Sequence, residues 1–337
     1  VVSMAPHDIR ARLGERFRLL AGGRRRQDRH RTLQAAVGWS YDLLEPEDQR
    51  VFRALSVFGG SFDLAAAAEV VGGDEFEVAD IVAGLARRSL VGHHGATGRY
   101  RLLETLRQYG ADRLAEAGEA GPAQERFATY ATRLARDEGR RFDSRHLTEA
   151  RDRLWAEMDN LRAVAEWFTE IGRVDALVEL TRDLWIFLTS EAPSIARAWI
   201  DPVVDRDQPP EPQLRYDAVW LAGACAIVVG DIERALVMVE RGRGLVTADG
   251  GIQESPWSLH PELMIAANMA DGPALRALCR RALALAAARG DGAAANFAAS
   301  MEMIAMEADT PEFEQRLAHL VTEAEAEGNP RWLATTL

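Results

Sequence analysis

The sequence RHRTLQAAVGWSYDLLEPEDQRVFRALSVFGG, residues 29–60, carries the strongest fold signals in the chain. An arginine-rich segment leads into apolar residues at helical spacing, which place Val37 and Tyr41 on one side of a helix. Pro46 and the two acidic residues after it start a second helix, because proline and carboxylates are favoured in a first turn. A pair of glycines ends this helix. Its predicted buried stripe consists of Val51, Phe52, Leu55 and Phe58.

Two more helices and a β-hairpin are predicted after Gly60. Residues 61–73 predict a short capped helix that is closed by two glycines, and residues 74–91 predict a third helix. Residues 89–103 predict two short strands joined by a loop that contains glycine, and another helix follows. Three helices followed by a hairpin are the order of a winged helix. We place this domain at residues 32–118.

The third predicted helix separates apolar from basic side chains. Its spacing turns Ile81, Leu85 and Leu90 inward and turns Arg87 and Arg88 outward. Trp39 and Tyr41, in the helical segment before Pro46, are expected to be core aromatics, because they recur at helical spacing with Leu43 and Leu44.

From Pro122 onward the sequence predicts almost nothing but helices. The dipeptides Gly230-Asp231, Asp271-Gly272 and Asp309-Thr310 recur at roughly forty residues, each between two apolar helical segments. A helix pair that buries its apolar face only by stacking on its neighbours is typical of a solenoid. The expected fold class is therefore mainly α: a winged helix, then an α-solenoid of degenerate tetratricopeptide-like helix pairs at residues 119–337. The proline-rich residues 205–213 form a predicted seam within it, and residues 1–31 are predicted to be the end of a preceding helical segment and a basic linker.

The composition excludes several classes of protein. The chain of 337 residues has a net charge of −12, which argues against a surface that coats nucleic acid or anionic membrane. All 40 basic residues are arginine, so the lysine of a phosphate-binding P-loop and the lysine of Schiff-base catalysis are both missing. No apolar run approaches the ~18 residues of a membrane helix. Cys225 and Cys279 are too few for a disulfide framework, which indicates a reducing cytoplasm.

Five segments, taken in order, resemble the bacterial signal-transduction ATPases among the LuxR/AfsR-type transcriptional regulators, which belong to the STAND, or NB-ARC-like, class. Four of them resemble the end of the nucleotide-binding module and its winged helix, and the fifth resembles the start of the following helical repeats. The segments are residues 29–33, 39–44, 52–67, 100–114 and 153–167.

The resemblance implies a fragment of such a regulator, and two departures limit it. The family's ATPase core with its P-loop is absent from this sequence, so ATP or ADP is implied only for that core and no cofactor is expected in this chain. Related winged helices often carry Met-His-Asp, whose histidine faces a nucleotide phosphate. The matching positions are Leu102, Leu103 and Glu104, which do not supply that contact.

The arginine-rich residues give the candidate interaction sites. The cluster at residues 24–31 is a solvated linker, a contact to the missing nucleotide module through Arg29 and His30, or a DNA-binding arm. In a DNA-binding winged helix, Arg87, Arg88 and Arg99 would contact phosphates, because guanidinium groups suit that geometry. The helix that carries Arg87 offers no Asn or Gln to read base edges.

Two functions remain open. No nucleophile motif or metal-ligand spacing is visible, and adjacent His93 and His94 point apart on a strand, so an enzyme is not expected. The favoured hypothesis is a non-catalytic regulatory region: the winged helix couples a nucleotide-binding module to a helical-repeat sensor, whose concave face binds a protein or a small ligand, and DNA is bound through another domain. The alternative is a free-standing DNA-binding regulator that uses the winged helix and the basic arm, with binding that weakens steeply with salt.

Overall fold

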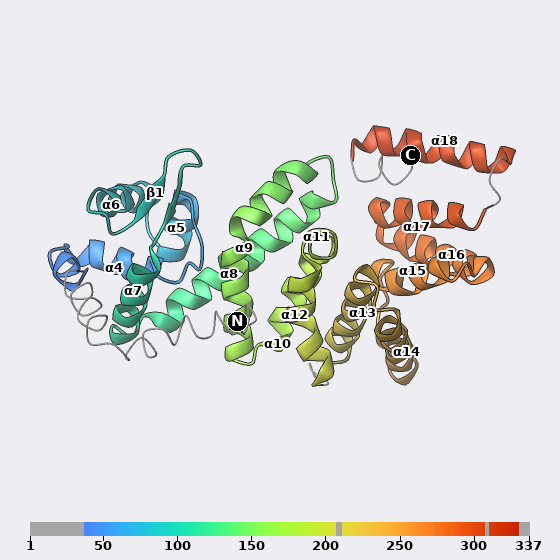
Figure 1. The fold of residues 1–337 in the computed structure, drawn as a ribbon, viewed down its shortest axis with the longest axis horizontal. Coiled ribbons are helices and arrows are strands. Elements are labelled where there is room, and N and C mark those ends of the chain that lie inside the picture. Colours follow the sequence, from blue (N-terminus) through green and yellow to red (C-terminus); the bar gives the residue numbers. More distant parts are fainter. Residues whose placement is uncertain (1–36, 207–210, 307–309, 330–337) are drawn as a thin grey trace, which may run out of the picture. The chain divides into compact units, whose positions relative to one another are not determined.

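The computed structural model describes residues 37–206, 211–306 and 310–329, and these residues are almost entirely helical (Figure 1). The chain divides into two compact units, an N-terminal unit of residues 1–130 and a C-terminal unit of residues 131–337. The predicted helix and linker of residues 1–31 lie outside the described residues, and so do Arg29 and His30.

The N-terminal unit has the predicted winged-helix order. Residues 37–42 are helical. The elements that follow are α4 (Pro46–Leu55), α5 (Leu64–Val71), α6 (Glu75–Arg87), β1 (Gly92–His94), β2 (Arg99–Arg101), α7 (Glu104–Glu116) and α8 (Ala120–Phe142). Strands β1 and β2 are antiparallel, and Phe62 bridges to Tyr100 through two backbone hydrogen bonds of 2.9 and 2.8 Å. This bridge lies between α4 and α5, the position of the first strand in a winged helix.

Local signals in the sequence set the starts of these helices. Pro46 occupies the first turn of α4, as predicted. The Asp63 carboxylate accepts a hydrogen bond from Ala66 N at 2.8 Å and caps α5. Asp74 accepts from the backbone N–H groups of Phe76 and Glu77 and caps α6 in the same way. Each cap satisfies donors that a helix leaves without partners at its N-terminus.

Large aromatic side chains fill the core of the N-terminal unit. Phe58 lies 4.6 Å from Phe62 and 5.1 Å from Phe127, measured between ring centroids. Tyr130 packs edge-on against Phe58 as well. Because Phe127 and Tyr130 lie on the first turns of α8, the compact unit extends to residue 130, beyond the predicted domain boundary at residue 118.

Two sequence predictions for this core were wrong. Trp39 is 69% exposed, whereas Tyr41 is buried as expected. Val37, Tyr41 and Leu44 follow each other at helical spacing on the buried side, and Trp39 lies about 200° around the helix from Val37, on the opposite side. In α6, Ile81 is only half-buried. The buried positions of that helix are Val78, Val82 and Leu85.

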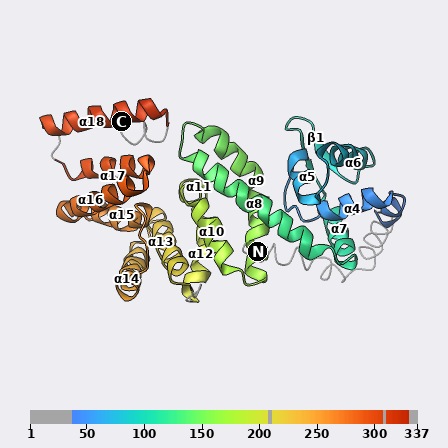
Figure 2. The same cartoon turned by 180° about the vertical axis from the view of Figure 1, so that it is seen from behind.

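The C-terminal unit consists of helices that pack on their neighbours in the chain. Its elements after α8 are α9 (Leu147–Glu170), α10 (Val174–Asp183), α11 (Trp185–Glu191), α12 (Pro193–Asp205), α13 (Pro212–Val228), α14 (Ile232–Ala248), the short 3-10 helix η2 (Trp257–Leu259), α15 (His260–Asn268), α16 (Gly272–Arg289), α17 (Gly292–Ile304) and α18 (Pro311–Glu327). Helices α13 and α14 lie side by side, as do α16 and α17, in both views (Figures 1 and 2). Helix α12 also packs on α13, on either side of the stretch predicted to be a seam.

One turn geometry recurs between these helices. At Gly230-Asp231, Ala270-Asp271 and Gly290-Asp291 the first residue has a positive φ of 79°, 54° and 65°, and the aspartate caps the next helix. The caps at Asp271 and Asp291 are nearly identical, with 3.0 and 2.9 Å to the N–H three residues on. The sequence reading missed the turn at Gly290. Asp309 lies outside the described residues.

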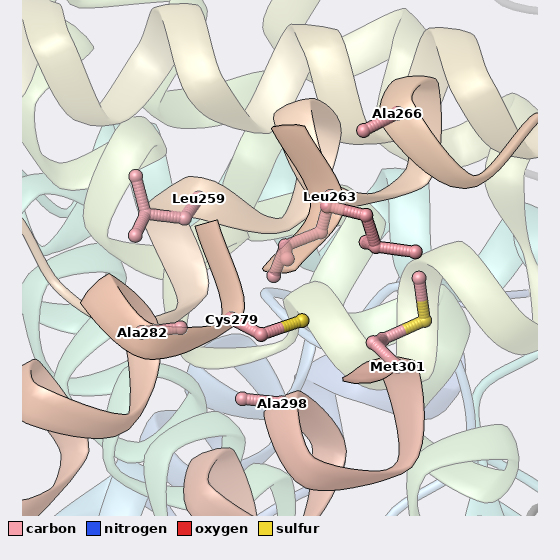
Figure 3. Packing of buried hydrophobic residues seen from close by; sticks show 8 residues of the cluster. Leu259, Leu263, Ala266, Cys279, Ala282, Ala298 and Met301 are labelled. Atoms are coloured by element: carbon pink, nitrogen blue, oxygen red, sulfur yellow. The ribbon is translucent and has the colours of Figure 1, made fainter. Parts of the chain in front are cut away.

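Small residues allow the helices of the C-terminal unit to approach closely. Figure 3 shows Leu263, Cys279 and Met301 pointing toward one another from α15, α16 and α17, with Ala266, Ala282 and Ala298 around them. Gly223 on α13 faces Met238 and Pro261, which an added Cβ would meet at 3.2–3.3 Å. Dense contact between neighbouring helices therefore depends on the absence of bulk at these positions.

Candidate interaction surface on the winged helix

Helix α6 is the element that a DNA-reading winged helix would place in the major groove. Its buried residues Val78, Val82 and Leu85 recur at helical spacing and hold it against α4 and α5. The remaining side of α6 is turned to solvent, so the chemistry of that side decides what the domain can bind.

The exposed side of α6 is acidic over its first two turns. Asp74, Glu75, Glu77 and Asp80 are all exposed, and Phe76 among them is 83% exposed. Carboxylates near a helix N-terminus stabilise the helix, because they interact favourably with the positive end of its dipole. The same carboxylates repel the phosphate backbone of DNA. This surface was not predicted from the sequence, although its acidic residues lie within seven positions of one another. We call residues 74–80 the acidic face.

The predicted phosphate contacts Arg87 and Arg88 lie at the other end of α6. Arg88 donates from its guanidinium to the Asp48 carboxylate at 2.8 Å. Arg87 is exposed and makes no ion pair among the residues that the structure describes. The helix ends where Ser89 takes a positive φ of 60° and Leu90 N donates to Leu85 O at 3.0 Å. One of the two arginines is therefore engaged within the domain.

The third predicted contact, Arg99, is turned into the domain. Its side chain is 11% exposed and donates to the Ser61 hydroxyl at 2.8 Å and to the Ser61 carbonyl at 2.6 Å. An ion pair of 3.9 Å to Asp63 adds to these contacts. Arg88 is therefore paired with Asp48 and Arg99 with Asp63, within the domain. The exposed basic side chain of strand β2 is instead Arg101, which the sequence reading did not select.

The two histidines of the hairpin have separate partners. The His93 ring lies against Tyr100 with 4.7 Å between ring centroids, and His94 Nδ1 lies 3.2 Å from the Thr97 hydroxyl. Leu103, at one of the positions matched to the phosphate-facing motif, is exposed at the start of α7.

Other arginines of the N-terminal unit also support its structure. Arg53 makes two hydrogen bonds to the Glu119 carboxylate, at 3.0 and 2.8 Å, and one of 2.8 Å to the Tyr41 hydroxyl. The bonds to Glu119 raise the pKa of Arg53 above its usual range. Arg126 donates to Val70 O at 2.7 Å, at the end of α5. These guanidinium groups bind the helices of the domain to one another.

Both cysteines of the chain are buried. Burial raises the pKa of the Cys225 and Cys279 thiols to about 12, so both remain protonated near neutral pH. Among the described residues, no three His, Cys, Asp or Glu side chains come close enough to hold a metal ion. None of the described helices is both long and apolar enough to cross a membrane.

Comparisons with known proteins support the fold of the N-terminal unit. A family model described as a winged helix-turn-helix domain matches residues 44–115. The Mycobacterium tuberculosis protein named "Putative HTH-type transcriptional regulator Rv0890c" is 40% identical over 190 residues, which are 55% of this chain and 21% of that protein. "Uncharacterized protein Rv0894" of the same organism is 36% identical over 135 residues, which are 38% of this chain and 34% of that protein. No solved structure matches the chain significantly.

The matches cover about a fifth of the first of these relatives and about a third of the second. Residues 44–115 form a winged helix-turn-helix domain, and a helical region follows it.

Proposed function

We propose that this chain is the regulatory region of a transcriptional regulator, in which the winged helix acts as an internal coupling domain. The acidic face of α6 is the observation that carries the proposal. Relatives named as HTH-type transcriptional regulators support the class of protein, and the winged helix-turn-helix match supports the domain. In this proposal, the winged helix passes a signal between a nucleotide-binding module of the STAND type and the helical region.

Electrostatics favours a protein partner over DNA at α6. The four carboxylates at positions 74, 75, 77 and 80 occupy the part of the helix that would approach base edges in a major groove. Phosphate contacts drive most of the affinity for DNA, and carboxylates oppose them. An acidic surface with the exposed ring of Phe76 at its centre suits a partner surface that carries arginines and an apolar pocket.

The helical region is proposed to be the sensor. Its neighbouring helices pack in pairs, and the same aspartate-capped turn recurs between them. We interpret these pairs as degenerate tetratricopeptide-like repeats, which present extended surfaces to a protein or a small ligand. A ligand bound there would shift a conformational equilibrium of the chain. The winged helix would pass that change to the nucleotide-binding module.

Salt-dependent DNA binding tests this proposal. Fluorescence anisotropy of a labelled mixed-sequence duplex is measured with the chain at ~50 and ~200 mM salt. The expected result is little binding at either salt concentration, whereas a DNA-binding chain would bind at the lower salt and lose affinity steeply at the higher. Removing negative charge with Glu75→Gln, Glu77→Gln and Asp80→Asn should increase binding, because phosphates would no longer be repelled. The matched control is the triple substitution Asp175→Asn, Glu179→Gln and Glu191→Gln at exposed positions of the C-terminal unit, which removes the same three charges and should change little.

The alternative is a DNA-binding regulator that uses Arg87 and Arg101. Both are exposed, and neither makes an ion pair among the described residues. This alternative requires tight binding by the unmodified chain, with a slope of about −0.9 in log K against log salt for each phosphate contact. Arg87→Gln and Arg101→Gln would each make that slope less negative. Such a result would replace the coupling proposal with the DNA-reading one.

A further inference from the structure

A cavity of about 600 Å³ opens among helices of the C-terminal unit. Its walls come from α10, α11, α13, the segment before η2, the end of α16 and the start of α17. This volume is in the usual range for small-molecule sites. Segments more than a hundred residues apart in the sequence supply its walls, so no local motif announces it.

Three tryptophans form the apolar part of the cavity. Trp185 lies 5.5 Å from Trp220 and 5.0 Å from Trp257, with interplanar angles of 82° and 58°. Trp220 Nε1 donates to Asp217 at 3.1 Å, and Trp257 Nε1 donates to Asp291 at 3.0 Å. These indole N–H groups already have acceptors, and Trp185 and Trp220 are buried, so the half-buried ring of Trp257 offers a ligand most of the aromatic surface.

The two carboxylates of the cavity are already occupied by donors of the protein. Asp217 accepts from Arg182 at 2.7 Å and from Gln213 at 3.3 Å, in addition to Trp220. Asp291 accepts from Ala294 N at 2.9 Å as the cap of α17, in addition to Trp257. Little acceptor capacity is left for a cationic ligand.

The guanidinium groups of the cavity retain donors. Arg182 donates from Nη1 to Asp217, and Arg289 donates from Nη2 to Glu254 O at 2.7 Å. A guanidinium has five N–H groups, so each arginine keeps several beyond these bonds. Two cations with spare donors beside aromatic walls match a ligand that has a negative group and a flat apolar body.

We propose that this cavity binds a small organic carboxylate with a planar ring system. The ring packs against the tryptophans, and the carboxylate accepts from Arg182 and Arg289. This inference deepens the proposed sensor role of the helical region by naming the ligand class and the residues that bind it. Its test is direct binding to the chain, which depends neither on DNA nor on coupling between domains, so the two proposals can fail separately.

Three indoles with the same ring and different charge test the ligand class. Isothermal titration calorimetry compares indole-3-acetate, tryptamine and 3-methylindole, which are negative, positive and neutral at pH 7. Indole-3-acetate should bind at least about tenfold more tightly than either of the others, because only its carboxylate accepts from the arginines. 1-Naphthoate, a second flat carboxylate, should bind as well.

Variants on one helix test the site. Arg289→Gln should weaken binding of indole-3-acetate at least about tenfold, whereas Arg280→Gln, an exposed arginine of the same helix outside the cavity, should leave it unchanged. Trp257→Leu should weaken binding of every probe that binds. Circular dichroism confirms that each variant is folded.

Three results would overturn the inference. In the first, tryptamine binds as tightly as indole-3-acetate or more tightly. In the second, the Arg280 and Arg289 variants behave alike. In the third, neither carboxylate binds at millimolar concentration.

Discussion

Two buried clusters, one in each unit, are built from different kinds of side chain. In the winged helix, Phe52, Phe58, Phe62 and Phe127 are almost completely buried and occupy the centre between short helices. In the cluster around Cys279, the buried positions include Ala266, Ala282 and Ala298, where neighbouring helices touch. The difference teaches that the packing around Phe58 depends on large rings, whereas the packing around Cys279 depends on small side chains that let the helices approach.

Arginine has different roles in the winged helix and at the cavity of the C-terminal unit. In the winged helix, Arg53, Arg99 and Arg126 bind carboxylates and carbonyls of neighbouring elements and so stabilise the domain. At the cavity of the C-terminal unit, Arg182 and Arg289 each donate to one acceptor among the described residues and keep donors for a ligand. The same residue type thus joins elements of the winged helix and supplies a candidate binding group at the cavity.

Phe58→Ala should have the largest effect, because it removes a ring from the centre of the aromatic core. We expect it to lower the free energy of unfolding of the N-terminal unit by about 3–5 kcal/mol, from lost burial and the cavity left behind. Hydrogen exchange read by mass spectrometry localises the effect. It is needed because Trp39 is the single tryptophan before residue 131, so tryptophan fluorescence reports mainly on the other unit.

Phe76→Ala is the control for this prediction. Phe76 is an aromatic residue of the same unit that is exposed on the acidic face, so its removal should change stability by less than about 0.5 kcal/mol. Similar effects of the two substitutions would contradict an aromatic core centred on Phe58.

Gly139→Ala should have the next largest effect. A Cβ at Gly139 on α8 would collide with the backbone carbonyl of Asp183, which no rotamer change relieves. We expect a loss of about 2–3 kcal/mol in the C-terminal unit, measured by urea unfolding followed by tryptophan fluorescence. Gly244→Ala, inside α14 with open space around it, should instead stabilise by about 0.5–1 kcal/mol. If Gly139→Ala were neutral, the close helix approach would be wrong.

The sequence predicted the fold where the signals are local. Pro46, Asp63 and Asp74 start helices through capping rules that involve only the next few residues, and the hairpin follows from its glycines. The exposure of Trp39 was mispredicted, since its residue type suggests burial and only its position around the helix contradicts this. The turn at Gly290 was missed because the assumed period of forty residues passes over it.

The candidate sites were harder to predict, for two different reasons. The acidic face was readable, because Glu75, Glu77 and Asp80 are close in sequence, and it was overlooked beside the arginines. The aromatic cavity was not readable, because Trp185 and Arg289 meet only after several helices have packed. The acidic face could thus be predicted from local charge alone, whereas the cavity depends on tertiary structure.

Ala270→Gly should give the smallest effect, and it should be a stabilisation. Ala270 has a φ of 54°, a left-handed conformation that costs a residue with a Cβ roughly 1–2 kcal/mol. The larger entropy that glycine loses on folding offsets part of this gain, so the expected increase is about 0.5–1 kcal/mol. Urea unfolding followed by tryptophan fluorescence measures it.

Gly290→Ala makes the converse change at the equivalent turn. No heavy atom lies within 4 Å of a Cβ built at Gly290, so backbone conformation alone should set its cost, about 1 kcal/mol. Opposite signs at the two positions would show that the turns are equivalent, because both carry the same left-handed residue before a capping aspartate. Stability changes of the same sign would mean that packing rather than backbone conformation dominates at one of the two positions. The turn would then not be a repeated structural unit of this helical region.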